Sequence, residues 1–292
     1  MLPLIRSLRP AQWAKNVFVL APLVFAQRLT DPRALATELL AFAAFCCAAS
    51  AVYLVNDIRD READRNHPLK RHRPLAAGTL AVGTASITAL VLAGLAAAAC
   101  FKLGRGFALC LAAYLVLNLL YSWGLKHMVI LDVMAIATGF LLRVLAGAAA
   151  LHVAVSGWLL LCTLFLSLFL AFSKRRHEIL LLSEQAAGQR KVLSHYSPSF
   201  LDQMINVVTA SAVISYALYT TAPETVAKFH TDKLVYTVPI VLFGIFRYLY
   251  LTYQKSDERN PTEAMLSDRP LLVTAVLWAV TVVWIVYGGP RP

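Results

Sequence analysis

Long apolar stretches separated by short polar segments run along almost the whole chain. Most are close to the ~20 apolar residues that an α-helix needs to cross a bilayer. The pattern predicts an all-α polytopic membrane protein with about nine transmembrane helices, the first of which is short for a complete crossing. The predicted spans cover residues 16–27, 35–55, 79–101, 106–122, 128–150, 153–173, 202–222, 233–253 and 270–288.

Composition supports this prediction and leaves little room for a separate soluble domain. The chain has 292 residues, of which 59% are hydrophobic and 15% are charged, whereas a soluble domain carries about 25% charged residues. We therefore expect one transmembrane domain over residues 1–292, surrounded by membrane lipid. The five cysteines lie in apolar stretches without a Cys-x-x-Cys pair, so neither a disulfide framework nor a zinc site is indicated.

The net charge is +11, and the basic residues are distributed unevenly among the loops. Because they lie in short loops between apolar spans, the excess indicates membrane topology and no nucleic-acid partner. With nine spans, 18 Lys and Arg residues fall on one side and 7 on the other. We therefore expect a multi-pass protein of the plasma (inner) membrane. Its N-terminus and the loops at residues 56–78, 174–201 and 254–269 would face the cytoplasm.

Several acidic residues follow one another where the second span reaches the cytoplasm. If the helix continues, Asp57, Asp60 and Asp64 share one face, and Asn56 is four residues from Asp60. Clustered carboxylates repel one another unless a cation holds them, and Mg²⁺ binds through carboxylates together with substrate phosphates. The alternative is a solvated helix end, because basic residues alternate with the acids, namely Arg59, Arg61 and Arg65.

Two basic clusters lie on the same predicted side. The first cluster directly follows the acidic residues and contains Lys70, Arg71 and Arg73 with His67 and His72. Arg in particular suits bidentate phosphate contacts. The second follows span six and contains Lys174, Arg175, Arg176, His177 and Glu178. Both are candidate phosphate-binding clusters, and plain positive-inside topology is the alternative for each.

Polar residues also occur inside two spans. Asp132, Gly139 and Arg143 lie close to one face of span five. A buried Arg in a span usually faces a water-filled cavity or a partner, although it can also snorkel. Tyr114 and Tyr121 belong to a similar stripe on span four, which interhelical hydrogen bonding explains almost as well.

The acidic segment Asn56-Asp57-x-x-Asp60-x-x-x-Asp64 resembles the first Asp-rich motif of the UbiA superfamily of intramembrane prenyltransferases. The resemblance covers nearly the whole chain in its arrangement of spans. It implies nine transmembrane helices around a central cavity. It also implies that Asp57, Asp60 and Asp64 are catalytic ligands of a Mg²⁺ cofactor that holds a diphosphate.

Five further segments resemble the decaprenyl-phosphate phosphoribosyltransferase branch of that superfamily. They are Arg9-Pro10-x-Gln12-Trp13-x-Lys15-Asn16, His67-Pro68-x-Lys70-Arg71-x-Arg73-Pro74, Tyr121-Ser122-x-x-Leu125-Lys126, Arg143-x-x-Ala146-Gly147 and Ser173-Lys174-Arg175-Arg176-x-Glu178. The branch moves 5-phosphoribose from phosphoribosyl diphosphate (PRPP) to a polyprenyl (decaprenyl) phosphate, and it leads to cell-wall arabinan. The match implies substrate-binding roles for Lys15, Asn16, Asn56, Lys70, Arg71, Arg73, Tyr121, Lys126, Arg143, Lys174, Arg175, Arg176 and Glu178.

One departure from the general superfamily favours this branch. Ordinary members carry a second Asp-rich motif after span six, where this chain has the basic cluster at residues 174–176. That cluster suits an additional phosphate better than a second Mg²⁺ ion. Two alternatives stay open: a prenyltransferase acting on an aromatic or haem acceptor, and a transporter. A homo-oligomer is also left open.

Overall fold

The computed structural model describes residues 2–66, 70–183, 196–254 and 267–288, and all regular structure in these residues is helical. Among them, seven helices are long and apolar enough to cross a membrane. They are α3 (Pro32–Arg59), α5 (Val82–Trp123), α6 (Leu131–Leu151), α7 (Gly157–Ser183), α8 (Pro198–Thr221), α10 (Val238–Tyr253) and α12 (Arg269–Tyr287). The predicted all-α, multi-pass class is confirmed. Residues of the motif and charge predictions that lie outside the described residues are His67, Pro68, Arg190, Lys191, Lys255, Arg259 and Arg291.

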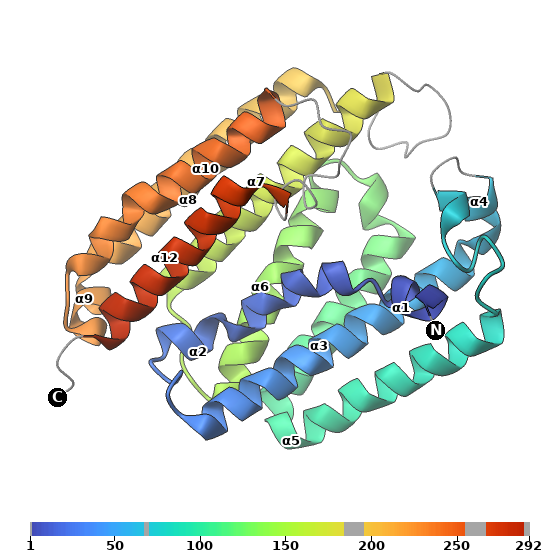
Figure 1. Cartoon of the computed structure of the whole chain (residues 1–292), viewed down its shortest axis with the longest axis horizontal. Coiled ribbons are helices and arrows are strands. Elements are labelled where there is room, and N and C mark those ends of the chain that lie inside the picture. Colours follow the sequence, from blue (N-terminus) through green and yellow to red (C-terminus); the bar gives the residue numbers. More distant parts are fainter. Residues whose placement is uncertain (1, 67–69, 184–195, 255–266, 289–292) are drawn as a thin grey trace. The chain divides into compact units, whose positions relative to one another are not determined.

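Two predicted spans fall on α5, which is 42 residues long. Its backbone is non-helical at Gly104, with φ 87° and ψ 172°, a conformation that is essentially restricted to glycine. Figure 1 shows α5 as two arms that run in different directions. The polar segment between the predicted spans 79–101 and 106–122 therefore contains a real break.

The predicted span at residues 16–27 has a different form. The chain there consists of the 3₁₀ helix η1 (Pro10–Leu20) followed by the short helix α2 (Ala21–Phe25). It is preceded by α1 (Leu2–Leu8), and Arg9 between α1 and η1 has φ 54° and ψ 61°. This segment is therefore not one regular α-helix, in agreement with its short apolar stretch.

Local sequence explains where three of the long helices begin. The Asp31 carboxylate accepts hydrogen bonds from the N–H groups of Arg33 and Ala34 at the start of α3. Ser197 caps α8 and Asp268 caps α12 in the same way. Each cap is followed within two residues by a proline, which has no N–H to satisfy in the first helical turn.

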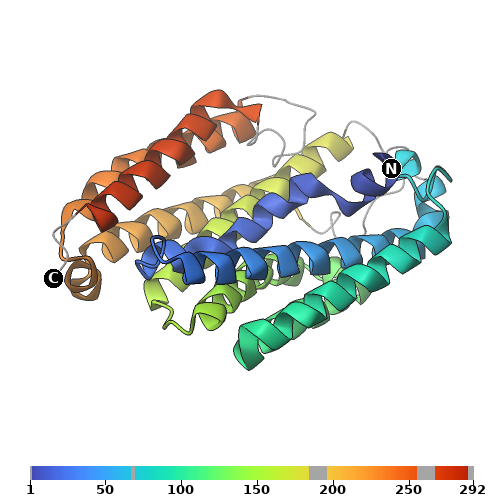
Figure 2. The same cartoon turned by 60° about the horizontal axis from the view of Figure 1, so that its bottom comes forward.

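The chain forms two compact units: unit 1 is Met1–Leu125 with Gly139–Val155, and unit 2 is Lys126–Thr138 with Ser156–Pro292. In unit 1, α3 packs along α5 (Figures 1 and 2) through small residues such as Ala41, Ala48, Ala96 and Ala99. In unit 2, α7 packs along α8, and α10 lies beside α12. Small residues allow helices to approach closely where lipid removes the hydrophobic driving force.

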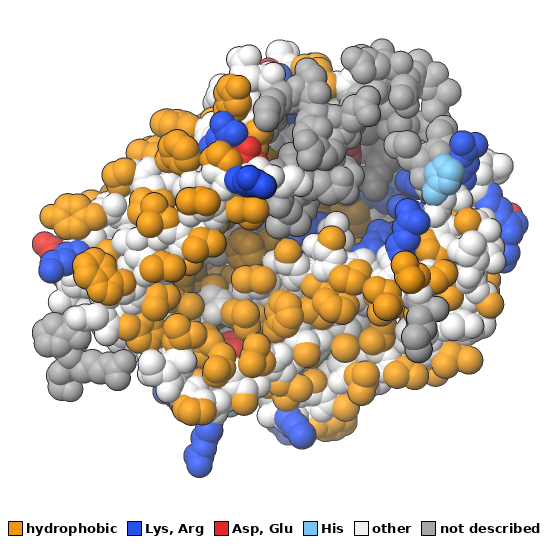
Figure 3. Space-filling view, viewed as in Figure 1, with side chains coloured by type: hydrophobic (Ala, Val, Ile, Leu, Met, Phe, Trp, Pro, Cys, Tyr) orange, Lys and Arg blue, Asp and Glu red, His pale blue; other side chains and the backbone are white. Residues whose placement is uncertain are grey.

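The outer faces of these helices are apolar. Leu90 and Phe101 on α5 are 75% and 92% exposed, and Val273 and Trp284 on α12 are 64% and 73% exposed. Figure 3 shows hydrophobic side chains over most of the visible face, with Lys and Arg gathered in a few places. Surfaces of this kind are stable in lipid and unfavourable in water.

Candidate active site

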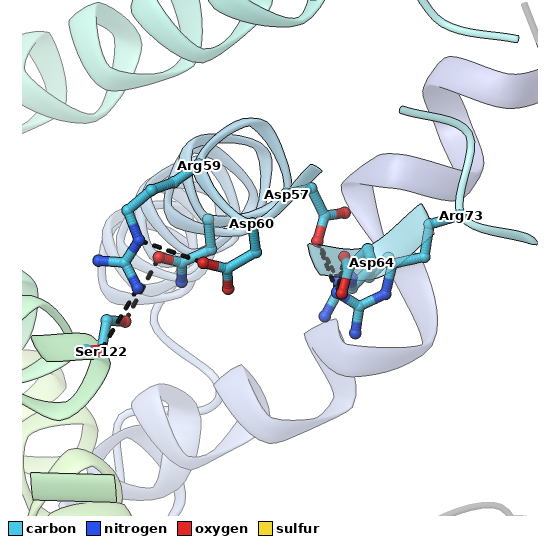
Figure 4. A network of polar contacts seen from close by, with 8 residues as sticks. Asp57, Arg59, Asp60, Asp64, Arg73 and Ser122 are labelled. Atoms are coloured by element: carbon cyan, nitrogen blue, oxygen red, sulfur yellow. Dashed lines mark hydrogen bonds and ion pairs between the residues drawn. The ribbon is translucent and has the colours of Figure 1, made fainter. Parts of the chain in front are cut away.

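A network of charged side chains lies at the C-terminal end of α3 (Figure 4). Asp57, in the last turn of α3, is buried, and Arg9 Nη2 donates to its Oδ1 at 2.6 Å. Arg73 Nη1 donates to the same oxygen at 3.1 Å and to Asp64 Oδ2 at 2.7 Å. Two buried carboxylates and two guanidinium groups thus join the segment at residues 57–73 to Arg9, which lies 48 residues before Asp57.

The prediction that three acids share one face of a continued helix is wrong. α3 ends at Arg59, Asp60 has φ −89° and ψ 7°, and α4 (Arg61–Arg65) is a separate short helix. Asp57 and Asp64 therefore both contact Arg73, whereas Asp60 accepts from Arg59 Nε at 3.2 Å (Figure 4). The helical register is lost at Asp60 because a ψ near zero ends the regular turn.

The end of α5 contacts this segment within unit 1. Ser122 Oγ donates to Asn56 Oδ1 at 3.3 Å, and Arg59 Nη2 donates to the Ser122 carbonyl at 3.3 Å. Tyr121 is half-buried at the same end of α5. The structure thereby brings the segment around Tyr121 next to the acidic segment, as members of one site would require. Lys126 is half-buried in η3 (Leu125–His127) and belongs to unit 2.

The basic cluster after the acids has two environments. η2 (Lys70–His72) contains Lys70, which is half-buried, and Arg71, which is exposed and donates from Nε to His72 Nε2 at 3.3 Å. Arg73 is directed to the acids. In this short segment, Arg73 therefore binds the carboxylates, whereas Arg71 is exposed to the surroundings.

Arg143 lies in a second buried network of unit 1. It is 6% exposed, and its guanidinium donates to Asn16 Oδ1 at 2.8 Å, the Gly139 carbonyl at 2.8 Å and Tyr114 Oη at 3.1 Å. The guanidinium also lies 4.7 Å from the centre of the Tyr114 ring. Two predicted substrate-binding residues, Asn16 and Arg143, therefore meet although they are 127 residues apart. Lys15, next to Asn16, is half-buried.

Arg175 is the most buried cation of the cluster on α7. Its side chain is 1% exposed, and Nε donates to Asp132 Oδ2 at 2.6 Å while Nη1 donates to Glu178. Asp132 is itself fully buried and accepts from Tyr196 Oη at 2.7 Å. Burial raises the pKa of the Tyr196 hydroxyl, which keeps it a donor to Asp132. The geometry favours a structural role for Arg175.

The two neighbours of Arg175 are more accessible. Lys174 is 41% exposed, with Nζ 3.8 Å from Glu178 Oε1. Arg176 donates to Asp202, and its guanidinium lies 3.9 Å from the centre of the Tyr253 ring. Each of the three cations therefore lies next to a carboxylate in unit 2, and they do not form a purely cationic patch.

The acids of unit 1 have the chemistry that a hard divalent cation requires. Mg²⁺ takes carboxylate and phosphate oxygens as ligands, and Asp57 and Asp64 each contact the bridging guanidinium of Arg73. The space between the two carboxylates thus already favours positive charge. Among the residues described, no three His, Cys, Asp or Glu side chains converge as a complete metal site. Asp57 and Asp64 would therefore hold a metal together with substrate oxygens.

Sequence reasoning missed two members of these networks. Arg9 belongs to a segment that resembles the phosphoribosyltransferase branch, but no role in the site is predicted for it from the sequence, although it forms the shortest contact with Asp57. Its position before Pro10, in the resembling segment 9–16, is the signal that could have identified it. Tyr196 gave no signal, because its partner Asp132 lies 64 residues earlier.

Known proteins resemble this chain in sequence and in fold. The model of the UbiA prenyltransferase family matches residues 17–268. The chain belongs to the UbiA prenyltransferase family. As a member of that family with seven long apolar helices in its described part, it is a multi-pass membrane protein.

Individual relatives of this UbiA family member are similar over most of the chain. The chain is 40% identical to the decaprenyl-phosphate phosphoribosyltransferase of Corynebacterium glutamicum, over 98% of this chain and 87% of that protein. It is 34% identical to the enzyme of the same name from Mycobacterium tuberculosis, over 95% and 92% of the two chains. A UbiA homolog from Archaeoglobus fulgidus, solved with GPP and Mg²⁺, superposes with a TM-score of 0.73 over 98% of each chain. Its sequence identity is 18%, so that likeness concerns the fold alone.

Proposed function

We propose that this UbiA family member is a Mg²⁺-dependent transferase that moves 5-phosphoribose from PRPP to a polyprenyl phosphate such as decaprenyl phosphate, releasing diphosphate. The product would feed arabinan precursor synthesis for the cell envelope. The observation that carries the proposal is the identity of 34–40%, over nearly the whole chain, to proteins named decaprenyl-phosphate phosphoribosyltransferase. The buried acid and arginine network at the end of α3 supports the proposal, because it would supply the ligands of the metal and of the phosphates.

In unit 1, Asp57, Asp60 and Asp64 would hold the metal, and the charge of the metal would attract the donor diphosphate. Asp57 and Asp64 already share the Arg73 guanidinium, whereas Asp60, which is 40% exposed and paired with Arg59, would have to turn to join them. When bound, Mg²⁺ would supply neutralisation of the charge that develops on the leaving diphosphate. Asn56 would orient the segment, and its contact with Ser122 would align Tyr121 with the donor.

The protein's remaining task is to bring two polyanions together. The phosphate of the lipid is an anion near neutral pH, so its oxygen can attack ribose C1, with inversion, without a strong general base. The bond from C1 to the diphosphate oxygen breaks as the new bond forms. Basic side chains would offset the repulsion between the substrates: Lys15, Lys70, Arg71, Arg73, Lys126, Arg143, Lys174 and Arg176. Arg175 does not belong to this set because its donors are engaged by Asp132 and Glu178. Asn16 and Glu178 would position Arg143 and Lys174, respectively.

The membrane arrangement is part of this proposal. The two arms of α5 and the segment formed by η1 and α2 would bring the number of crossings to nine within a single domain over residues 1–292. The N-terminus and the site would face the cytoplasm. A homo-oligomer remains compatible with this arrangement.

The test is a transfer assay with purified protein, labelled PRPP, decaprenyl phosphate and MgCl₂, followed by extraction of the lipid. We expect label in the lipid with PRPP and no product with a prenyl diphosphate and an aromatic acceptor. EDTA should abolish the transfer, and Mg²⁺ should restore it. Asp64→Asn should lower kcat/KM roughly a hundredfold or more, as loss of transition-state electrostatics does.

Glu62→Gln is the matched control, because Glu62 lies in the same short helix but its side chain is 76% exposed and pairs with Arg65. It should retain wild-type activity. Transfer from a prenyl diphosphate, or equal activity of Asp64→Asn and wild type, would overturn the proposal.

A further inference from the structure

The carboxylates and guanidinium groups at the end of α3 differ in accessibility. The side chains of Asp57 and Asp64 are 4% and 5% exposed, whereas those of Arg9 and Arg73 are 30% and 31% exposed. The acids are therefore enclosed, and the arginines that bind them are partly accessible. A ligand at this site can contact the guanidinium groups, whereas the carboxylates are covered.

These four side chains together carry two negative and two positive charges. A divalent cation that approaches Asp57 and Asp64 must therefore compete with charge-assisted hydrogen bonds of 2.6 to 3.1 Å. A diphosphate must in turn compete with the carboxylates for the same guanidinium groups. Each ligand alone is opposed by the existing ion pairs, because like charges repel at these distances.

We infer that Arg9 and Arg73 are stand-in cations, which hold Asp57 and Asp64 in place until the metal arrives and then transfer their hydrogen bonds to the phosphates of the donor. The inference rests on the proposed function and adds a mechanism by which metal and diphosphate binding are coupled. Metal on the carboxylates releases the guanidinium groups, and phosphate on the guanidinium groups releases the carboxylates. Each ligand thus favours the other.

The backbone around Arg73 suits such an exchange. Its N–H donates to the Lys70 carbonyl at 2.9 Å, and its own carbonyl accepts from the Ala77 N–H at 2.8 Å. The main chain is therefore held on both sides while the partly exposed side chain can change rotamer. Arg9 has an equivalent accessible position, with its guanidinium 4.8 Å from the centre of the Tyr53 ring. The exchange requires movement of two side chains and no rearrangement of helices.

The inference predicts effects of opposite sign in one variant. Arg73→Gln should bind Mn²⁺, a spectroscopic substitute for Mg²⁺, more tightly than wild type when no phosphate is present, because a competing cation is gone. The same variant should bind labelled inorganic pyrophosphate more weakly at saturating Mn²⁺, because a donor to phosphate is gone. Loss of one charge-assisted contact corresponds to roughly tenfold to a hundredfold in affinity in each case. Arg9→Gln should show the same pair of changes.

The measurements are Mn²⁺ titration followed by electron paramagnetic resonance and filter binding of pyrophosphate, both on the full-length protein in detergent. Arg65→Gln is the matched control, because Arg65 is a nearby arginine whose contacts are with Glu62 and the Ala76 carbonyl. Its two affinities should equal those of wild type. If Arg73→Gln fails to fold, Arg9→Gln and Arg73→Lys carry the test, and Arg73→Lys should show a smaller gain in Mn²⁺ affinity.

Mn²⁺ affinity that is unchanged or reduced in the folded Gln variants would overturn the inference, because a purely structural arginine gives that result. The outcome is separable from the proposed function, since neither PRPP nor a polyprenyl phosphate is used. Opposite shifts in a protein that transfers no phosphoribose would support the inference and refute the proposed function. Normal phosphoribosyl transfer without opposite shifts in Mn²⁺ and pyrophosphate affinity would support the proposed function and refute the inference.

Discussion

Arg175 is a cation that the protein buries almost completely, between Asp132 and Glu178. Removing one partner from a buried ion pair leaves an unpaired charge in a medium of low polarity, which costs about 3–5 kcal/mol. The residue was predicted to bind a substrate phosphate, but its donors are directed to two carboxylates of unit 2. Its main contribution is therefore expected to be stability.

Arg175→Ala should lower the free energy of unfolding by about 3–5 kcal/mol, because the fully buried Asp132 loses its cation. Thermal unfolding of the detergent-solubilised protein measures this effect. Lys174→Ala is the control, since Lys174 is 41% exposed, and it should change the midpoint little. A wild-type melting temperature combined with a raised KM for PRPP in Arg175→Ala would show that the substrate role is correct instead.

At the scale of elements, a close backbone contact joins η1 to α6 within unit 1. A Cβ atom placed on Gly147 would lie 2.0 Å from the Val19 carbonyl oxygen. Only glycine allows this approach, and it occurs one helical turn after Arg143, which binds Asn16 of the same 3₁₀ helix. The two segments that resemble the phosphoribosyltransferase branch at residues 9–16 and 143–147 are therefore parts of one interface.

Gly147→Ala should displace η1 and lower both the thermal stability of the protein and its activity. Gly94→Ala is the matched control in an apolar helix, because a Cβ there meets nothing within 4 Å. That control should be neutral or stabilising by up to about 1 kcal/mol, the difference in helix propensity between Gly and Ala. Equal melting temperatures for the two variants would contradict the close contact.

At the scale of the whole molecule, the asymmetry of 18 against 7 basic residues predicts which loops face the cytoplasm. A single cysteine introduced at Asn66 should be protected from an impermeant maleimide in intact cells, and one at Arg33 should be labelled. Both positions are exposed in the structure, so protection reports the membrane and not burial. The background is a variant without the five native cysteines. Labelling at position 66 from outside would reverse the predicted orientation.

The apolar pattern alone determined the class of this protein. Spans of about 20 residues can be read from sequence because lipid requires continuous apolar helices that satisfy their own backbone hydrogen bonds. Predicted boundaries agree with α6, α8 and α12 to within four residues. The irregular form of residues 10–25 was not predictable, because a short apolar stretch does not specify whether its backbone is 3₁₀ or α-helical.

The residues of the candidate site were visible in the sequence, but their pairing was decided by tertiary structure. Spacing placed Asp57, Asp60 and Asp64 on one face, and the end of α3 at Arg59 separated Asp60 from the other two. The sequence at residues 174–176 predicts a cationic cluster. In the structure, Asp132 and Asp202, which are distant in the sequence, form ion pairs with Arg175 and Arg176. The physical reason is the same in both cases. Residue type and local spacing fix which charges are present, whereas the partner of a buried charge comes from another segment that only folding brings into contact.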